Sequence, residues 1–219
     1  MLTLSEELFL LTMSERKSSV AVSSAQALPV ALVGAMLTEL LVISKITLED
    51  GDKVLLVSPS KTENEYFNYV LSKIEKAKKP KRLVHWVETF SEKPNKLEKS
   101  LVDCLIAKKV LKEKKKKLLW VIPFLDYSQA DASAKFWRKR HIRAIILAGE
   151  TIDIQSASLL NLLISCKLMD YLFTNDEMRY AEKRAEEVIK DPSLTPVFVN
   201  ISGKVSSACA KAVEAGELA

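Results

Sequence analysis

The stretch that decides the fold runs from Ser18 to Ile43 and reads SSVAVSSAQALPVALVGAMLTELLVI. Glu39 is the only charged residue in it. A helix that is apolar on every face either spans a membrane or forms the buried centre of a helical bundle. The serines, Gln26 and Pro29 make the first half too polar for hydrocarbon. The sequence therefore predicts a buried central helix over about Ala25 to Ser44.

The composition is typical of a globular, helical protein. The chain has 219 residues, of which 48% are apolar and 28% charged, with only five glycines and seven prolines. These values favour a single domain over residues 1–219 that is mainly α. Three scattered cysteines and two histidines argue against a disulfide framework or a histidine metal site, so no cofactor or metal is expected. No targeting segment is recognised, and we expect a cytoplasmic protein.

Periodicity predicts further helices around the central one, with two small β-hairpins. The hairpins are expected near Ile46–Val57 and Val110–Phe124, and in the second the strands are Val110–Lys114 and Leu118–Phe124. The other helices are expected at about Thr3–Met13, Asn64–Lys76, Lys81–Phe90, Lys96–Lys108, Ala132–Leu147, Ile152–Met169 and Glu177–Ile189, with a last one after Gly203. The expected fold is a central helical bundle ringed by amphipathic helices.

The two hairpin regions resemble each other. Leu37–Pro59 and Leu101–Pro123 align without a gap over 23 positions and share eight identical residues. Two helix–hairpin units of this kind could be winged-helix-like halves, so nucleic-acid binding is the alternative function. The Lys96–Lys108 helix offers Lys99 and Asp103 but no Arg or Gln for base edges. We therefore expect no nucleic-acid partner.

The middle of the chain is strongly basic. Between Lys73 and Lys117 there are 16 Lys or Arg and 6 Asp or Glu, a local charge of +10 in a chain of net charge +5. A basic region on a mildly acidic body indicates a face for acidic lipid or nucleic acid. The plain alternative is a solvated lysine-rich surface.

The second predicted hairpin combines cationic and apolar residues. An isolated hairpin cannot bury both faces, so we expect some of its apolar residues to contact a membrane or a second copy, giving a homo-oligomer. The alternative is that the helix Ala134–Ile146 covers them. The candidate anion-binding turn is Lys114, Lys115, Lys116 and Lys117, and the candidate membrane or self-association residues are Leu118, Trp120 and Ile122.

Catalytic motifs are absent from the sequence. It has no glycine-rich phosphate loop, no Gly-x-Ser-x-Gly turn and no His-Glu-x-x-His, so an enzyme is not expected. We expect His85 to be half-buried on an apolar helix rather than a general base. The basic stretch Lys135–Arg143 is predicted to be an amphipathic helix with a basic outer side, and we expect Phe136 or Trp137 to be buried.

The order of several segments resembles the Golgi phosphoprotein 3-like family over Leu2 to about Val213. The resemblance implies an α-helical fold, a hairpin used in self-association and membrane contact, and a minimal, prokaryotic-type member. Eukaryotic relatives bind phosphatidylinositol 4-phosphate and act as Golgi adaptors. The matching segments are Leu2-Thr-Leu-Ser-Glu-Glu-Leu-Phe-Leu-Leu, Leu32-Val-Gly-Ala-Met-Leu-Thr-Glu-Leu, Lys45-Ile-Thr-Leu, His85-Trp86-Val87, Leu101-Val-Asp-Cys-Leu-Ile-Ala-Lys-Lys-Val-Leu, Leu159-Leu-Asn-Leu-Leu and Ala181-Glu-Lys-Arg-Ala.

The chain departs from this family at the headgroup pocket. The resemblance implies a pocket of one tryptophan and three basic residues, and Ser24, Val33, Asn95 and Glu98 stand at those positions. Nearby cations could rebuild an anion site, and the candidates are Arg82, Lys96 and Lys99. We therefore expect a peripheral, non-catalytic, adaptor-like protein that binds anionic phospholipid headgroups.

Overall fold

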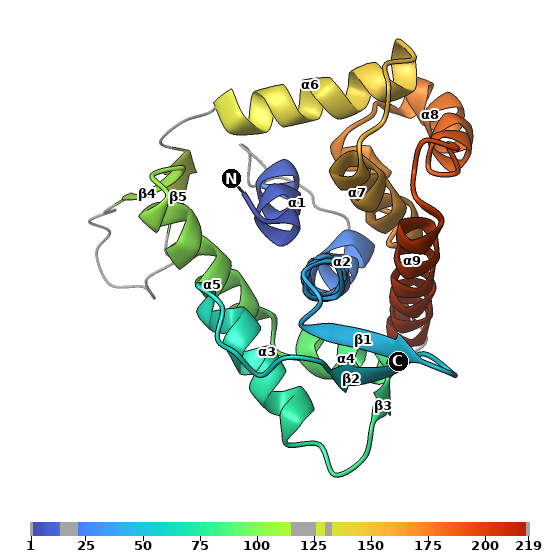
Figure 1. The fold of residues 1–219 in the computed structure, drawn as a ribbon. Helices are drawn as coiled ribbons and strands as arrows, with labels where there is room; N and C mark the ends of the chain where they lie inside the picture. The colour runs from blue at the N-terminus through green and yellow to red at the C-terminus, as the bar shows by residue number, and fades with distance from the viewer. Residues whose placement is uncertain (1, 14–21, 115–125, 130–132, 218–219) are drawn as a thin grey trace.

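The computed structural model describes residues 2–13, 22–114, 126–129 and 133–217 and is mainly helical, as predicted (Figure 1). Two small antiparallel sheets accompany the helices, with strand orders β1-β2-β3 and β4-β5. The elements are α1 (Leu4–Thr12), α2 (Val22–Val42), β1 (Ile46–Glu49), β2 (Lys53–Leu56), α3 (Glu65–Glu75), β3 (Lys81–Arg82), α4 (Leu83–Ser91), α5 (Pro94–Ala107), β4 (Leu111–Lys114), β5 (Asp126–Gln129), α6 (Ser133–Leu147), α7 (Ile154–Ser165), the 3-10 turn η1 (Met169–Tyr171), α8 (Asn175–Val188) and α9 (Pro196–Glu217).

Helix α2 is the predicted central helix. Helices α1, α4, α7 and α9 pack against it (Figure 1). Leu32, Val33, Met36, Leu37 and Leu40 are fully buried, although they point in different directions around the helix. Burial of a leucine-sized side chain contributes about 1.5–3 kcal/mol, so this helix is a main source of folding energy. None of the described helices is both long enough and apolar enough to cross a bilayer.

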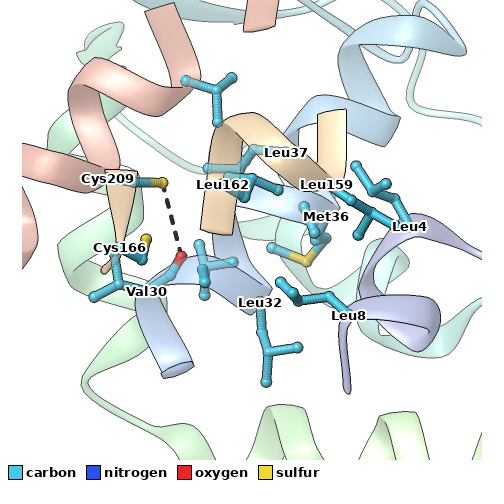
Figure 2. Packing of buried hydrophobic residues seen from close by; sticks show 14 of the residues in the cluster. Leu4, Leu8, Val30, Leu32, Met36, Leu37, Leu159, Leu162, Cys166 and Cys209 are labelled. Carbon is cyan, nitrogen blue, oxygen red and sulfur yellow. Dashed lines mark hydrogen bonds between the residues drawn. The ribbon is translucent and has the colours of Figure 1, made fainter. Parts of the chain in front are cut away.

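Gly34 allows α2 to approach α7 and α9 closely. A Cβ atom at this position would lie 2.5 Å from the Cys209 Sγ and 2.7 Å from a Leu162 methyl carbon. The same region holds Cys166 and Cys209, and the Cys209 thiol donates to the Val30 carbonyl over 3.8 Å (Figure 2). The space that a side chain at position 34 would take is thus filled by side-chain atoms of α7 and α9.

We expect Gly34→Ala to destabilise the protein by about 1–3 kcal/mol, because the added methyl overpacks a dense core. Gly203→Ala is the matched control, since a Cβ there meets nothing within 4 Å and the residue lies inside α9. That substitution should stabilise by about 0.5–1 kcal/mol through helix propensity. Urea unfolding of both variants measures the difference, and equal stabilities would contradict the close approach.

The first predicted hairpin is confirmed. Strands β1 and β2 pair with Ile46 opposite Leu56, and Gly51 and Asp52 take the positive φ that a tight turn needs. The prediction missed β3, which adds two residues to the edge of β2. A two-residue strand has no periodicity of its own, and its pairing depends on tertiary structure.

The second predicted hairpin needs correction. Leu111 lies opposite Gln129 and Lys114 opposite Asp126, so the return strand is Asp126–Gln129 and not Leu118–Phe124. Its polar sequence, Asp-Tyr-Ser-Gln, lacks the alternation that marks a half-buried strand. Residues 115–125, which include most of the predicted turn and the predicted strand, lie outside the described residues.

The internal repeat is real at the helix ends but is shifted by one residue. Helix α2 ends with Ser44 at positive φ and α5 ends with Lys109 in the same conformation, and in each case the next residue donates to the carbonyl of Leu40 or Leu105. Both are αL helix ends. Ile46 therefore corresponds to Leu111, whereas the gap-free alignment pairs Ile46 with Val110. The two units diverge at their return strands.

Two further predictions are wrong. The last helix begins at Pro196, before Gly203, because Pro is well suited to the first helical turn. Phe136 and Trp137, one of which is expected to be buried, have 57% and 59% of their surfaces exposed. The inner face of α6 is formed instead by Ile142, Ile145 and Ile146, which are fully buried.

Helix α1 is fastened by carboxylates at its N-terminus. The Glu6 side chain accepts from the Thr3 N–H, forming a capping box, and pairs with the Lys108 ammonium at 2.7 Å. Glu39 of α2 accepts from the Leu4 N–H at 3.1 Å. Burial raises the pKa of Glu39 to about 7, and the neighbouring Glu6 adds to this while the Leu4 bond opposes it.

We expect Glu39→Gln to stabilise the protein near pH 8 and to leave stability near pH 5 almost unchanged. The ordinary pKa of the carboxyl is 4.5, so the folded state holds the proton more tightly and stability falls as pH rises from about 4.5 to about 7. A shift of this size corresponds to at most about 3 kcal/mol. Denaturation at both pH values tests this, and a pH dependence identical to that of the parent protein would refute it.

Candidate anion-binding surface

The basic stretch of the sequence forms surface. All twelve Lys and Arg residues between positions 73 and 112 are exposed. They lie on α3, on the turn that follows it, on β3 and along α5 to β4. Four exposed acids lie in the same stretch, Glu75, Glu88, Glu92 and Asp103, so cations outnumber acids about three to one on its surface. Such an excess of positive charge favours an anionic partner.

The most organised part of this surface surrounds Tyr69. The Lys96 ammonium lies 3.5 Å from the centre of the Tyr69 ring, and the Lys73 ammonium lies 5.6 Å from it. The ring also meets Phe90 edge-on with its centroid at 6.2 Å, and Phe90 stacks on Trp86. Two lysines from different helices thus share one aromatic platform that is fixed by the core.

Local structure explains why these side chains meet. Asn64 caps α3 by accepting from the Tyr66 and Phe67 N–H groups, and this sets the rotation of the helix. Tyr69 and Lys73 are four residues apart and share a face. Lys96 joins them because α5 begins at Pro94 and packs against α3.

This arrangement favours an anion chemically. Two ammonium groups near one ring repel each other, and a phosphate or carboxylate bound beside either of them would reduce the repulsion and accept charge-assisted hydrogen bonds. Cation–π contact with the ring holds both lysine side chains near the site and offsets part of the conformational entropy that they lose there. We therefore take Tyr69, Lys73 and Lys96 as the candidate site.

A second basic spot lies on the three-stranded sheet. Lys53 of β2 is directly opposite Arg82 of β3, and the Arg82 Nε donates to the Gly51 carbonyl at 3.2 Å. Like charges directly opposed across a strand pair are destabilising unless a counter-charge is present. The hydrogen bond to Gly51 holds the Arg82 side chain at the first hairpin turn.

The structure places the predicted site residues as follows. Lys96 and Lys99 are three residues apart on α5, and both are exposed. The backbone of Lys114 belongs to β4. The predicted residues Lys115, Lys116, Lys117, Leu118, Trp120 and Ile122, with the side chain of Lys114, lie outside the described residues, so those predictions stay open.

Sequence reasoning missed Tyr69, Lys73 and Lys53 as site residues. The four-residue spacing of Tyr69 and Lys73 in a predicted helix was an available signal. The contact of Lys96 with the same ring is tertiary and has no local signal.

The positions of the family's headgroup pocket take no cationic role in this chain. Val33 is fully buried in the core and Asn95 is exposed. Burial raises the pKa of the half-buried Glu98. None of these three side chains supplies a positive charge.

The two histidines have structural neighbours. His85 is exposed and meets Trp86 edge-on at 5.4 Å, so the expectation that it is half-buried is wrong. His141 Nε2 lies 3.0 Å from an Asp153 carboxylate oxygen, and Asp153 caps α7. Burial acts to raise the pKa of Asp153, but hydrogen bonds from Ser156 outweigh it and the pKa falls to about 2.

Within residues 2–13, 22–114, 126–129 and 133–217, no group of three His, Cys, Asp or Glu could hold a metal.

Comparison with known proteins identifies the family. No curated protein matches the chain. The family model described as Golgi phosphoprotein 3 (GPP34) matches residues 4–215, which is nearly the whole chain. The chain therefore belongs to the Golgi phosphoprotein 3 (GPP34) family.

Proposed function

We propose that this protein is a peripheral, non-catalytic, adaptor-like protein that binds anionic phospholipid headgroups. The observation that carries the proposal is the convergence of Lys73 and Lys96 on the Tyr69 ring. Membership of the GPP34 family supports an adaptor-type role.

The surrounding charge supports binding at a membrane surface. Each Lys or Arg near an anionic leaflet contributes about 1 kcal/mol, and the attraction falls off within a Debye length of about 8 Å at physiological salt. Only the cations that face the bilayer together contribute. A handful of them suffices for reversible binding, which suits an adaptor.

Self-association belongs to the same proposal. Leu118, Trp120 and Ile122 follow a lysine run in the sequence and would serve a membrane or a second copy. The test of this part is the oligomeric state of a Trp120→Ala protein.

We expect the double variant Lys73→Gln/Lys96→Gln to lose binding to vesicles of phosphatidylcholine and phosphatidylserine by about tenfold or more, most clearly at low salt. The control, Lys190→Gln/Lys211→Gln, removes the same charge from two other exposed lysines. Lys190 follows α8, and Lys211 lies on α9. Vesicle flotation measures both. Equal losses would show that net charge alone acts, and binding to DNA but not to vesicles would favour the nucleic-acid alternative.

We also expect weak headgroup selectivity. The family pocket positions hold Ser24, Val33, Asn95 and Glu98, so binding should follow surface charge. Vesicles with phosphatidylserine, cardiolipin or phosphatidylinositol 4-phosphate at matched charge should differ less than about tenfold, or 1.4 kcal/mol. A larger preference for one headgroup would mean that the chain has a stereospecific pocket.

A further inference from the structure

Helix α6 has a second apolar face that points away from the core. Ile142, Ile145 and Ile146 are fully buried on one side. On the other side Phe136 and Trp137 are 57% and 59% exposed, and their rings meet at 5.3 Å. Leu147 extends this outer face by three turns at 38% exposure, and Ala144 lies between. Single exposed apolar residues are ordinary, but two large aromatic residues in contact, with a leucine on the same side of the helix, indicate an interaction surface.

The orientation of this face is fixed by ionic contacts on the flanks of α6. Arg138 pairs with Glu7 of α1 at 2.9 Å. Arg143 makes a two-pronged contact with Glu177 of α8 and also donates to the Leu172 carbonyl at 2.8 Å, and Lys139 donates to the Tyr171 carbonyl at 3.0 Å. These contacts on two sides prevent the helix from rolling, so the aromatic pair cannot turn inward. Figure 1 shows α6 at the edge of the fold, across the ends of α1 and α7.

The outer face of α6 also carries an exposed cation. The helix has five Lys or Arg and no Asp or Glu, but four of them contact other parts of the protein, so Arg140 is the cation that the outer face presents. The four are Lys135, Arg138, Lys139 and Arg143. Arg140 is exposed beside the aromatic pair, with its guanidinium 5.5 Å from the centre of the Trp137 ring. A face of Trp, Phe and Leu with basic neighbours is the composition of helices that lie in the headgroup layer of an anionic bilayer. A symmetric contact between two copies would instead bring Arg140 toward its own equivalent, with no acid on α6 to offset it.

We propose that the outer face of α6, formed by Phe136, Trp137, Arg140 and Leu147, lies in the headgroup layer of an anionic membrane. This rests on the proposed function and adds to it a membrane-contacting element separate from the lysines at Tyr69. The aromatic rings enter the acyl boundary, and Arg140 stays at the level of the phosphates. The apolar contact is insensitive to salt, whereas the lysine attraction is screened.

The test compares Phe136→Ala/Trp137→Ala with the control Val42→Ala/Val197→Ala, which trims two exposed valines, 54% and 70% accessible, beside the groove between the first hairpin and α9. Flotation uses vesicles of phosphatidylcholine with phosphatidylserine, at low and high salt. We expect the aromatic variant to lose about tenfold or more in binding at both salt concentrations and the valine variant to match the parent protein. Both should keep the parent melting temperature, because the trimmed side chains are exposed.

Tryptophan quenching by lipids brominated in the upper acyl chain gives an independent measurement that requires no loss of binding. The parent protein has Trp86, Trp120 and Trp137, and the quenched component should fall in Trp137→Phe. Unchanged quenching in that variant, or unchanged flotation of the double alanine variant, overturns the inference. If the lysine variant of the preceding section still loses binding, the proposed function survives that failure. Sedimentation without vesicles that shows a dimer in the parent and a monomer in the aromatic variant would assign the face to a second copy instead.

Discussion

The approach of α2 to α7 and α9 at Gly34 is the constraint on which the rest of the structure depends. Because Gly34 has no side chain, the Cys209 thiol of α9 and Leu162 of α7 fill the space beside the α2 backbone. Most of the described side chains of α2 between Ala27 and Leu41 are buried. Each helix that packs on α2 therefore uses one of its own faces for that contact. Only outer faces remain for a partner, and the elements that carry the candidate surfaces, α3, α5 and α6, lie in that outer layer (Figure 1).

The distribution of charge follows from this layering. A buried carboxylate is costly, and where acids approach the core they are paired or shifted toward the neutral form. Glu6 meets Lys108, Glu7 meets Arg138, and the pKa of Glu39 rises to about 7. The acids near the core are thus paired or shifted toward the neutral form, and the exposed lysines of α3 and α5 face solvent. This separation gives a protein of modest net charge one strongly basic surface.

Sequence reasoning predicted the parts that local physics determines. The uncharged run predicted α2 as the central helix. The Glu-Asp-Gly-Asp turn predicted the position of the first hairpin within a residue or two. It failed where tertiary contacts decide. The pairing of β3, the polar strand Asp126–Gln129 and the meeting of Lys96 with Tyr69 have no local signature. The one-residue shift in the repeat has the same cause. The gap-free alignment matches the largest number of identical residues, but the two helix ends correspond only when the second unit is shifted by one residue.

Helix α6 shows most clearly why periodicity alone cannot locate a functional face. Its sequence has apolar residues on two sides, and either side satisfies the pattern of a half-buried helix. The side of α6 that faces the core is set by two ion pairs. Arg138 pairs with Glu7 of α1, and Arg143 pairs with Glu177 of α8. Helix α1 is in turn held against α2 by Leu4, Leu8 and Leu11. The central helix α2 thus positions α1, and α1 orients α6 through the Arg138–Glu7 ion pair. This orientation leaves Phe136 and Trp137 exposed.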